Sequence, residues 1–439
     1  MRGEFDNIHQ GLSQVEALKI LTSCVEELGS RSDFYMAVSH LINFPNEETV
    51  DGLIGFLQVV SEEQSVLLAQ RKAVEVLGRL CSKEAEQVIG QCLGSKDVYM
   101  VENAAWALGR LGTQDWGLHQ AMMTLLSDAG QNRRVLIQTL SSLAIEEAQA
   151  QFTQLASDDV PSVAGAAIAA LAKKGRVSQQ QLTKLSDHLF LPNQMDRQSA
   201  VQDIIDAQAV SLLPDVIKAP ISPAFKTRAL KSLLDDNHLS CSDAAPLIQK
   251  IFQDNPQEMI VLHHYDCTHA PEFLVGELFC PDFSRCYLAM QELVKRDGQL
   301  IWPVLKQAWL DRAHNDYGAH YFFMHLFGLI DSWPLDSSSE IKEILLNAIN
   351  DRRPQFRKSP PAALLSLALR FPDSFAQQLD SFFSGNKISS WQKRFAYLQA
   401  LGLLQKPMWP DATSPFLAQL ATTDAESLVR FKAQYLVEL

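Results

Sequence analysis

The feature that most constrains the fold is a helical pattern that recurs every 31 residues. AQRKAVEVLGRL begins at Ala69, and MVENAAWALGRL begins 31 positions later at Met100. Apolar positions follow helical spacing in both segments, and the two Gly-Arg-Leu triplets coincide. Related patterns return in QNRRVLIQTLSSL (131–143), VAGAAIAALAKKG (163–175), DRQSAVQDIIDA (196–207), KTRALKSLLDDN (226–237), WQKRFAYLQALGLL (391–404) and VRFKAQYLVEL (429–439). A fixed period of this length indicates a repeat architecture.

Each repeat has the pattern of two helices joined by short turns rich in Gly, Asp, Ser and Pro. One such pair cannot bury its apolar face alone, but stacked pairs can. The sequence therefore predicts an all-α fold, a right-handed α-solenoid of HEAT-like helical hairpins of about 31 residues. The predicted divisions are an N-terminal helical cap (1–60), regular repeats (61–245), irregular repeats rich in His and Tyr (246–385), and C-terminal repeats with a cap (386–439).

Composition excludes several classes of protein. The chain is 47% hydrophobic and 20% charged, which is typical of a globular protein. A net charge of −13 argues against nucleic acid as a partner. No apolar run is long enough to span a membrane, and the N-terminal residues lack the apolar region of a signal peptide. Seven cysteines without CxxC pairs favour a reducing compartment, so we expect a cytoplasmic protein.

The repeat at 98–111 carries an unusual polar face. On a helical wheel, Val101, Ala104, Ala105, Leu108 and Leu111 lie on one side, whereas Tyr99, Glu102, Asn103, Trp106 and Arg110 lie on the other. If this segment is the second helix of its hairpin, the latter face lines the concave groove, with Arg71 and Arg133 from the neighbouring repeats. Such a groove suits an anionic, partly aromatic ligand or an acidic protein surface. The alternative is structural, with each Arg pairing with a turn Asp of the next repeat.

A second group of candidate site residues lies in residues 260–333, which hold six of the eleven histidines. As a helix, residues 311–331 would bury phenylalanines and leucines and present Tyr317 and Tyr321 to a lined cavity, flanked by Asp316 and His320. The alternative is that these Tyr and His residues are half-buried repeat contacts.

The stretch HHYDCTH holds several residues of metal-ligating type, but their spacing fits no common zinc pattern, so we expect no metal. Cys267 is a possible nucleophile or a structural cysteine. Asp266 stands out because aromatic neighbours would raise its pKa and make it a proton donor near neutral pH. Nucleotide-binding, hydrolase and zincin motifs do not occur.

VENAAWALGRLG, SHLINFPNEETVDGLI (39–54), RKAVEVLGRL (71–80) and YDCTHAPEF (265–273) resemble segments of the cyanobacterial phycobilin lyases of the E/F class. The resemblance covers most of the chain. It is strongest to the long lyases, or lyase-isomerases, that act on the α-subunit of phycoerythrin. It implies attachment of phycoerythrobilin to a cysteine of that subunit, with or without isomerisation to phycourobilin. Shorter relatives work as two-subunit pairs. The resemblance therefore leaves two alternatives for this chain, which acts either alone or with a second lyase subunit.

Applied to this chain, the resemblance gives the candidate residues roles in binding and proton transfer. The bilin is a substrate, and no cofactor is expected. Arg71, Arg110 or Arg133 would bind its propionates, Tyr99 and Trp106 would stack on it, and Asp266 or Glu102 would hydrogen-bond its pyrrole nitrogens. Asn103, Tyr317 and Tyr321 complete the predicted binding set. Tyr265, His269, Asp316 or His320 would take part in proton transfer.

The alternative function is a non-catalytic HEAT-like scaffold or chaperone that binds a protein partner in its groove. It accounts for the repeats equally well but leaves the His and Tyr residues of 260–333 unexplained. Only a lyase would yield a covalent, coloured adduct.

Overall fold

The computed structural model describes residues 9, 11–235, 239–383 and 390–438, and it divides into two compact units, Met1–Gln181 and Leu182–Leu439. In the described residues every regular element is a helix, so the predicted all-α class is confirmed. The parts of the predicted caps at 1–8, 10, 386–389 and 439 lie outside the described residues. The unit boundary falls inside the segment predicted as regular repeats, and each unit is described by itself.

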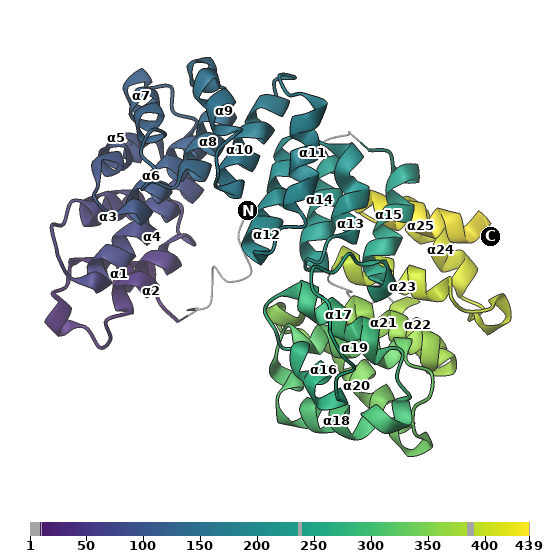
Figure 1. The fold of residues 1–439 in the computed structure, drawn as a ribbon. Coiled ribbons are helices and arrows are strands. Elements are labelled where there is room, and N and C mark those ends of the chain that lie inside the picture. Colours follow the sequence, from purple (N-terminus) through teal and green to yellow (C-terminus); the bar gives the residue numbers. More distant parts are fainter. Residues whose placement is uncertain (1–8, 10, 236–238, 384–389, 439) are drawn as a thin grey trace. The chain divides into compact units, whose positions relative to one another are not determined.

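Unit 1 is a stack of helical hairpins (Figure 1). Its helices are α1 (Gln14–Thr22), α2 (Asp33–Leu41), α3 (Glu47–Leu57), α4 (Gln64–Leu80), α5 (Glu86–Gln91), α6 (Val98–Leu111), α7 (Trp116–Leu125), α8 (Arg133–Ser142), α9 (Gln149–Leu155) and α10 (Pro161–Ala172). Helices α2, α4, α6, α8 and α10 pack each on the next, and α5, α7 and α9 cover their own partners. The predicted second helix at 98–111 is α6, with the same bounds.

Local sequence signals set the ends of these helices. Asp97 caps α6 by accepting a hydrogen bond from the backbone N–H of Tyr99 at 3.0 Å. Gly112 ends the same helix in the left-handed region, with φ of +65°, where a residue without Cβ is least strained. Pro161 occupies the first turn of α10, where its missing N–H has no cost. The turn residues therefore define the hairpins.

Unit 2 contains the remaining hairpins, and α11 (Gln179–His188) spans the boundary. Its helices are α12 (Gln194–Asp206), α13 (Leu213–Lys218), α14 (Pro223–Asp235), α15 (Cys241–Gln253), α16 (Pro271–Glu277), α17 (Phe283–Leu293), α18 (Gly298–Asp311), α19 (Ala319–Leu329), α20 (Ser338–Asn350), α21 (Ser359–Arg370), α22 (Pro372–Phe383), α23 (Trp391–Leu401), α24 (Thr413–Thr423) and α25 (Ser427–Glu438). Helices α17, α19, α21, α23 and α25 form a row in which each packs on the next.

Unit 2 also makes contacts that a simple solenoid lacks. Helix α15 packs against α21 and α25, far along the chain, as well as against α14 (Figure 1). Lys231 pairs with Glu426 at 2.9 Å, and the Gln399 amide donates to the carbonyl of Gln249 at 3.1 Å. In an open solenoid each repeat contacts only its neighbours. The last repeats thus close back onto α14 and α15, which the repeat pattern did not predict.

The helix predicted over 311–331 is interrupted. Helix α18 ends at Asp311, a short 3-10 turn covers Ala313–Asn315, and α19 begins at Ala319. Asp316 accepts hydrogen bonds from the backbone N–H groups of Gly318 and Ala319, both at 2.9 Å. Its carboxylate satisfies the free donors of the first turn and so favours a new helix start.

Close packing of α19 on α21 depends on Gly328. A Cβ at this position would lie 2.8 Å from Cα of Ser366. The Ser366 hydroxyl holds the contact by donating to the carbonyl of Met324 at 2.7 Å. Because the blocking atom belongs to the backbone of α21, a larger residue has to push the helices apart.

We predict that Gly328→Ala lowers the free energy of unfolding by about 1–3 kcal/mol, the usual cost of overpacking. Thermal unfolding followed by circular dichroism measures the change. The matched control is Gly276→Ala in α16, where a Cβ meets nothing within 4 Å, and it should be neutral or stabilise by up to about 1 kcal/mol. Equal midpoints for the two variants would contradict this account of the contact.

Candidate functional site

The predicted site residues fall into two groups, one in each unit. The first lies along α4, α6 and α8 of unit 1. Arg71 on α4 pairs with Asp97 at 2.6 Å, and Arg133 on α8 makes a bidentate pair with Asp158 at 2.7 and 3.1 Å. Each Asp stands in the turn before the next second helix. The structural alternative is therefore confirmed for these two pairs, and the charge of each arginine is paired.

The aromatic residues of this group differ in accessibility. The ring of Tyr99 is 62% exposed and stacks under the guanidinium of Arg71, 4.9 Å from ring centroid to Cζ. Trp106 is half-buried, and its ring edge lies 3.0 Å from where a Cβ on Gly78 of α4 would stand. Tyr99 is thus open to a flat ligand, whereas Trp106 contributes to packing between repeats.

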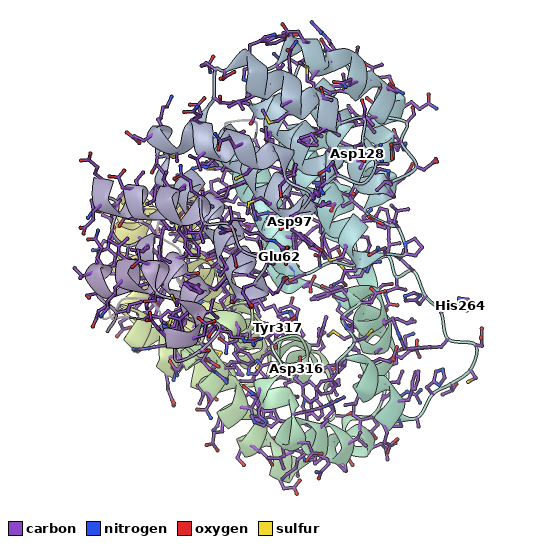
Figure 2. All side chains as sticks on the ribbon, turned by 90° about the vertical axis from the view of Figure 1, so that its left-hand side faces the viewer. Glu62, Asp97, Asp128, His264, Asp316 and Tyr317 are labelled. Atoms are coloured by element: carbon purple, nitrogen blue, oxygen red, sulfur yellow. The ribbon has the colours of Figure 1, made fainter. Side chains whose placement is uncertain are left out.

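The Arg–Asp ion pair of the neighbouring repeats is missing at α6. Glu102 occupies the position equivalent to Arg71, and Asp128 occupies the position equivalent to Asp97, 31 residues on in each case. Both are acidic, so no pair forms there; Figure 2 labels Asp97 and Asp128. Asn103 and Glu102 are half-buried, and Arg110 is exposed. Arg110 makes no ion pair with any residue the structure describes.

The second group begins on the loop between Met259 and Pro271, which leads into α16. Asp266 and His264 lie 3.1 Å apart, and their side chains are 93% and 87% exposed. Figure 2 shows His264 on a loop that projects from the helices. The apolar surroundings that were the reason for choosing Asp266 as a proton donor are therefore not present around its carboxylate. The catalytic role expected for Asp266 is not tested by the structure, but the physical reason for expecting it is lost.

Behind this loop, three rings form a small cluster. His269 stacks on Phe273 at 4.2 Å between ring centroids, and Tyr265 packs edge-on to His269 at 4.8 Å. Burial, reinforced by Glu277, raises the pKa of Tyr265 to about 12. The hydroxyl of Tyr265 is buried and has no hydrogen-bond partner in the part of the chain that the structure describes. Cys267 is exposed beside the cluster.

The residues of HHYDCTH do not converge. His263 turns to Asp282, with Nε2 3.1 Å from the carboxylate, whereas His264 turns to Asp266. Among the described residues there is no group of three or more His, Cys, Asp or Glu side chains placed to hold a metal ion.

At the start of α19, Asp316 and Tyr317 lie next to one another (Figure 2). Asp316 is half-buried and accepts two backbone N–H bonds at the start of α19, whereas Tyr317 is 64% exposed. His320 points into the core between Trp309 and Phe356, at 5.1 and 4.8 Å between ring centroids. Burial lowers the pKa of His320 to about 4, so its imidazole is neutral at pH 7. It offers no accessible proton donor.

The prediction that Tyr321 faces a cavity is wrong. Tyr321 and His325 are 3% and 5% exposed, and the Tyr321 hydroxyl donates to Oδ2 of Asp254 at 2.7 Å. The helical wheel assumed one buried face, but α17, α20 and α21 pack around α19. Its whole surface is therefore interior.

Asp254 is the centre of this buried polar network. Besides Tyr321, it accepts a hydrogen bond from Tyr287 at 2.5 Å, and its Oδ1 lies 3.2 Å from Nζ of Lys226. His325 Nε2 lies 2.9 Å from the Tyr321 hydroxyl. Although burial opposes ionisation, Lys226, His325 and the two hydroxyls hold the pKa of Asp254 below its ordinary value. Burial and Asp254 raise the pKa of both tyrosines.

Sequence reasoning missed Lys358, the residue before α21. Its ammonium lies 5.1–5.5 Å from the ring centroids of Phe283, Tyr317 and Tyr321. It makes no hydrogen bond or ion pair with any described residue. Burial lowers the pKa of Lys358 to about 8, although Cys286, Asp316 and Asp254 oppose this shift. The only local signal was a basic residue before Ser-Pro-Pro, a pattern typical of a helix start.

Comparison with known proteins identifies the family. No family model matches the chain. The bilin biosynthesis protein CpeY of Synechococcus sp. strain WH8020 is 38% identical over 411 residues, covering 93% of this chain and 98% of that protein. The chain belongs to the family of CpeY. The resemblance inferred from VENAAWALG and YDCTHAPEF is thus confirmed.

A second relative agrees with this membership. Uncharacterized phycocyanin operon protein Y of Pseudanabaena tenuis strain PCC 7409 is 33% identical and covers 81% of this chain and 84% of that protein. A solved chain from the complex of CpcE and CpcF of phycocyanin lyase of Nostoc sp. PCC7120 is 22% identical, with a TM-score of 0.45, over 55% of this chain and 94% of that one. This structural likeness is too weak to support a functional assignment. In the residues described, no helix combines the length and apolar character needed to cross a membrane.

We predict that Tyr321→Phe destabilises the protein by about 1–3 kcal/mol, because the buried Asp254 carboxylate loses a hydrogen bond that nothing replaces. The unfolding midpoint measures the loss. Tyr317→Phe is the matched control, since the Tyr317 hydroxyl is exposed and makes no hydrogen bond with a described residue. An unchanged midpoint for Tyr321→Phe would show that the network contributes nothing to stability.

Proposed function

We propose that the protein is a phycobilin lyase that attaches phycoerythrobilin, through a thioether bond, to a cysteine of the α-subunit of phycoerythrin. The observation that carries the proposal is the 38% identity to CpeY across nearly the whole length of both chains. The partners are then a linear tetrapyrrole and a phycobiliprotein, with a second lyase subunit as an optional participant. The bilin is the substrate and no cofactor takes part. The seven cysteines are free, which supports a cytoplasmic site of reaction.

The reaction requires the protein to position the bilin against the acceptor cysteine and to transfer a proton. The S–H bond of the acceptor cysteine breaks, its sulfur bonds to the side chain of bilin ring A, and a proton is added to the neighbouring ring carbon. Because the acceptor supplies the nucleophile, this chain acts by orientation and general acid–base catalysis. Its own cysteines are not part of the reaction. Burial raises the pKa of Cys286 far above its ordinary value, so this thiol stays protonated.

The surface at Asp316, Tyr317 and Lys358 supports this function better than the loop at Asp266. It combines a half-buried carboxylate, an exposed phenol ring and an unpaired cation. These are the group types that transfer a proton, stack on a conjugated plane and attract a carboxylate. In unit 1, Tyr99 and Arg110 remain candidates for stacking and for propionate binding. The scaffold alternative has no observation in its favour beyond the repeats.

The test of the function is co-expression with phycoerythrobilin and the phycoerythrin α-subunit. After denaturing electrophoresis, we expect colour on the acceptor and none on this chain, because the thioether is made to the acceptor cysteine. The absorption of the adduct also distinguishes attachment alone from attachment with isomerisation, because isomerisation shortens the conjugated system. A denaturation-resistant adduct on the exposed Cys267 would contradict the mechanism. The control is the same mixture without this protein.

The proton donor is tested by a matched pair, Asp316→Asn and Asp266→Asn. Asp316 accepts both backbone N–H bonds at the start of α19 through Oδ1, and the amide oxygen of asparagine can accept the same bonds, so Asp316→Asn should keep the helix start and remove only the acid. We expect it to lower the ligation rate by roughly 10²–10⁴-fold, the usual contribution of a general acid. Asp266→Asn should retain most ligation, because its carboxylate is 93% exposed and is paired only with His264. If Asp266→Asn lowered the ligation rate more than Asp316→Asn, Asp266 would be the proton donor.

A further inference from the structure

Lys358 stands out from the other buried or half-buried cations of unit 2. Lys226 has Asp254 as its partner, and Arg394 makes a bidentate pair with Asp424. Lys306 also lies over an aromatic ring, Trp302, but it is paired with Glu340 at 2.7 Å. Lys393 and the buried Lys432 also lack an anionic partner, but Lys393 donates to the carbonyl of Ile349 at 2.6 Å and Lys432 to Oε1 of Gln249 at 3.4 Å. Lys358 instead has ring neighbours and makes neither a hydrogen bond nor an ion pair with any described residue. Partial burial of a cation without a partner is costly, so this site is suited to an anionic ligand.

The surroundings of Lys358 define what that ligand must be. Phe283 and Tyr321 are 8% and 3% exposed and form the buried side, whereas Tyr317 is 64% exposed and forms the open side. An incoming group therefore meets the ammonium on a surface of low polarity, next to an exposed ring. This combination suits a carboxylate attached to a flat conjugated molecule, since the ammonium can pair with the carboxylate and the phenol ring can stack on the conjugated rings.

We propose that Lys358 binds one propionate of the bilin, with Tyr317 stacked against the adjoining ring. This inference rests on the proposed function, and it adds a substrate-binding residue that pairs with a defined group of the substrate. No covalent step is involved. Lys358 positions the substrate, and Asp316, on the same surface, is left to handle the proton.

The electrostatic neighbours of Lys358 set the pH range of the interaction. They are Asp316 before α19, Asp254 after α15, Cys286 on α17, the phenols Tyr317 and Tyr321, and the buried imidazole of His320 on α19. Burial brings the pKa of Lys358 to about 8 in the free protein. The ammonium is therefore present below pH 8 and lost above it. The propionates stay ionised throughout, so binding should be nearly constant from about pH 6 to about pH 7 and weaken progressively as the pH rises through about 8.

The experiment measures the dissociation constant of phycoerythrobilin by absorption titration, without acceptor, for the wild type and Lys358→Met. Loss of one charge-assisted hydrogen bond should weaken binding by roughly 10- to 100-fold. Lys306→Met is the matched control and should leave binding unchanged. Lys358→Arg should restore part of the affinity, because it keeps the charge.

The dimethyl ester of the same bilin is the second arm, because it removes the carboxylate charges from the ligand. The wild type should bind the ester more weakly than the acid, and Lys358→Met should reduce this discrimination by the same 10- to 100-fold. The assignment would be overturned if the wild type and Lys358→Met showed the same ratio of affinities for the acid and the ester. It would also be overturned if the two proteins bound the acid with the same affinity. If Lys358→Met does not fold, the wild-type protein alone tests the assignment. The assignment is then overturned if the wild type binds the acid and the ester equally well, or if its affinity for the acid does not change above pH 8. Absence of any bilin binding by the wild type would overturn the proposed function itself.

Discussion

The structure depends on one recurring interaction, in which a cation on a second helix pairs with an aspartate in the turn before the next second helix. Arg71 with Asp97 and Arg133 with Asp158 are two examples in unit 1, and Arg394 with Asp424 repeats the arrangement in unit 2. The same aspartate also accepts the backbone N–H two residues further on, which lies in the following helix for Asp97 and directly before it for Asp158 and Asp424. One carboxylate thus satisfies a helix start and joins it to the preceding repeat. These pairs are partly exposed and each adds little to stability, but together they set the spacing between repeats.

In unit 2 the same pairing becomes fully buried, and its role changes. Lys226 and Asp254 are 0% and 1% exposed in their side chains, so the pair cannot be screened by water. Asp254 adopts a left-handed backbone, with φ of +37°, which brings its carboxylate between the helices. Two tyrosine hydroxyls, from α17 and α19, complete its hydrogen bonds. A buried network of this kind is favourable only when every member is satisfied, so it fixes α14, α17 and α19 in one arrangement.

The 31-residue period was sufficient to predict the fold class and the bounds of α6, because both depend on local spacing and on turn residues. It also allowed the pairing of Arg71 and Arg133 with turn aspartates to be stated as an alternative. It failed for Tyr321 and His320, because a helical wheel assumes one buried face and α19 is enclosed by several helices. It missed Lys358, whose surroundings come from residues 37–75 positions earlier in the chain. It also missed the closure of α25 onto α15, since no local pattern encodes which distant repeat a helix meets.

The pairing rule also separates structural cations from functional ones. A cation already held by a carboxylate must give up that pair before it binds an anionic substrate, and the abandoned carboxylate then repels the substrate. Arg71 and Arg133 are in this position, which makes them poor candidates for propionate binding. Arg110 and Lys358 make no ion pair within the described residues, so either can accept a carboxylate at no such cost. Of the two, Arg110 is exposed to solvent, whereas Lys358 is half-buried beside aromatic rings. Its attraction for an anion is accordingly less weakened by solvent, and the affinity gained on binding is correspondingly larger.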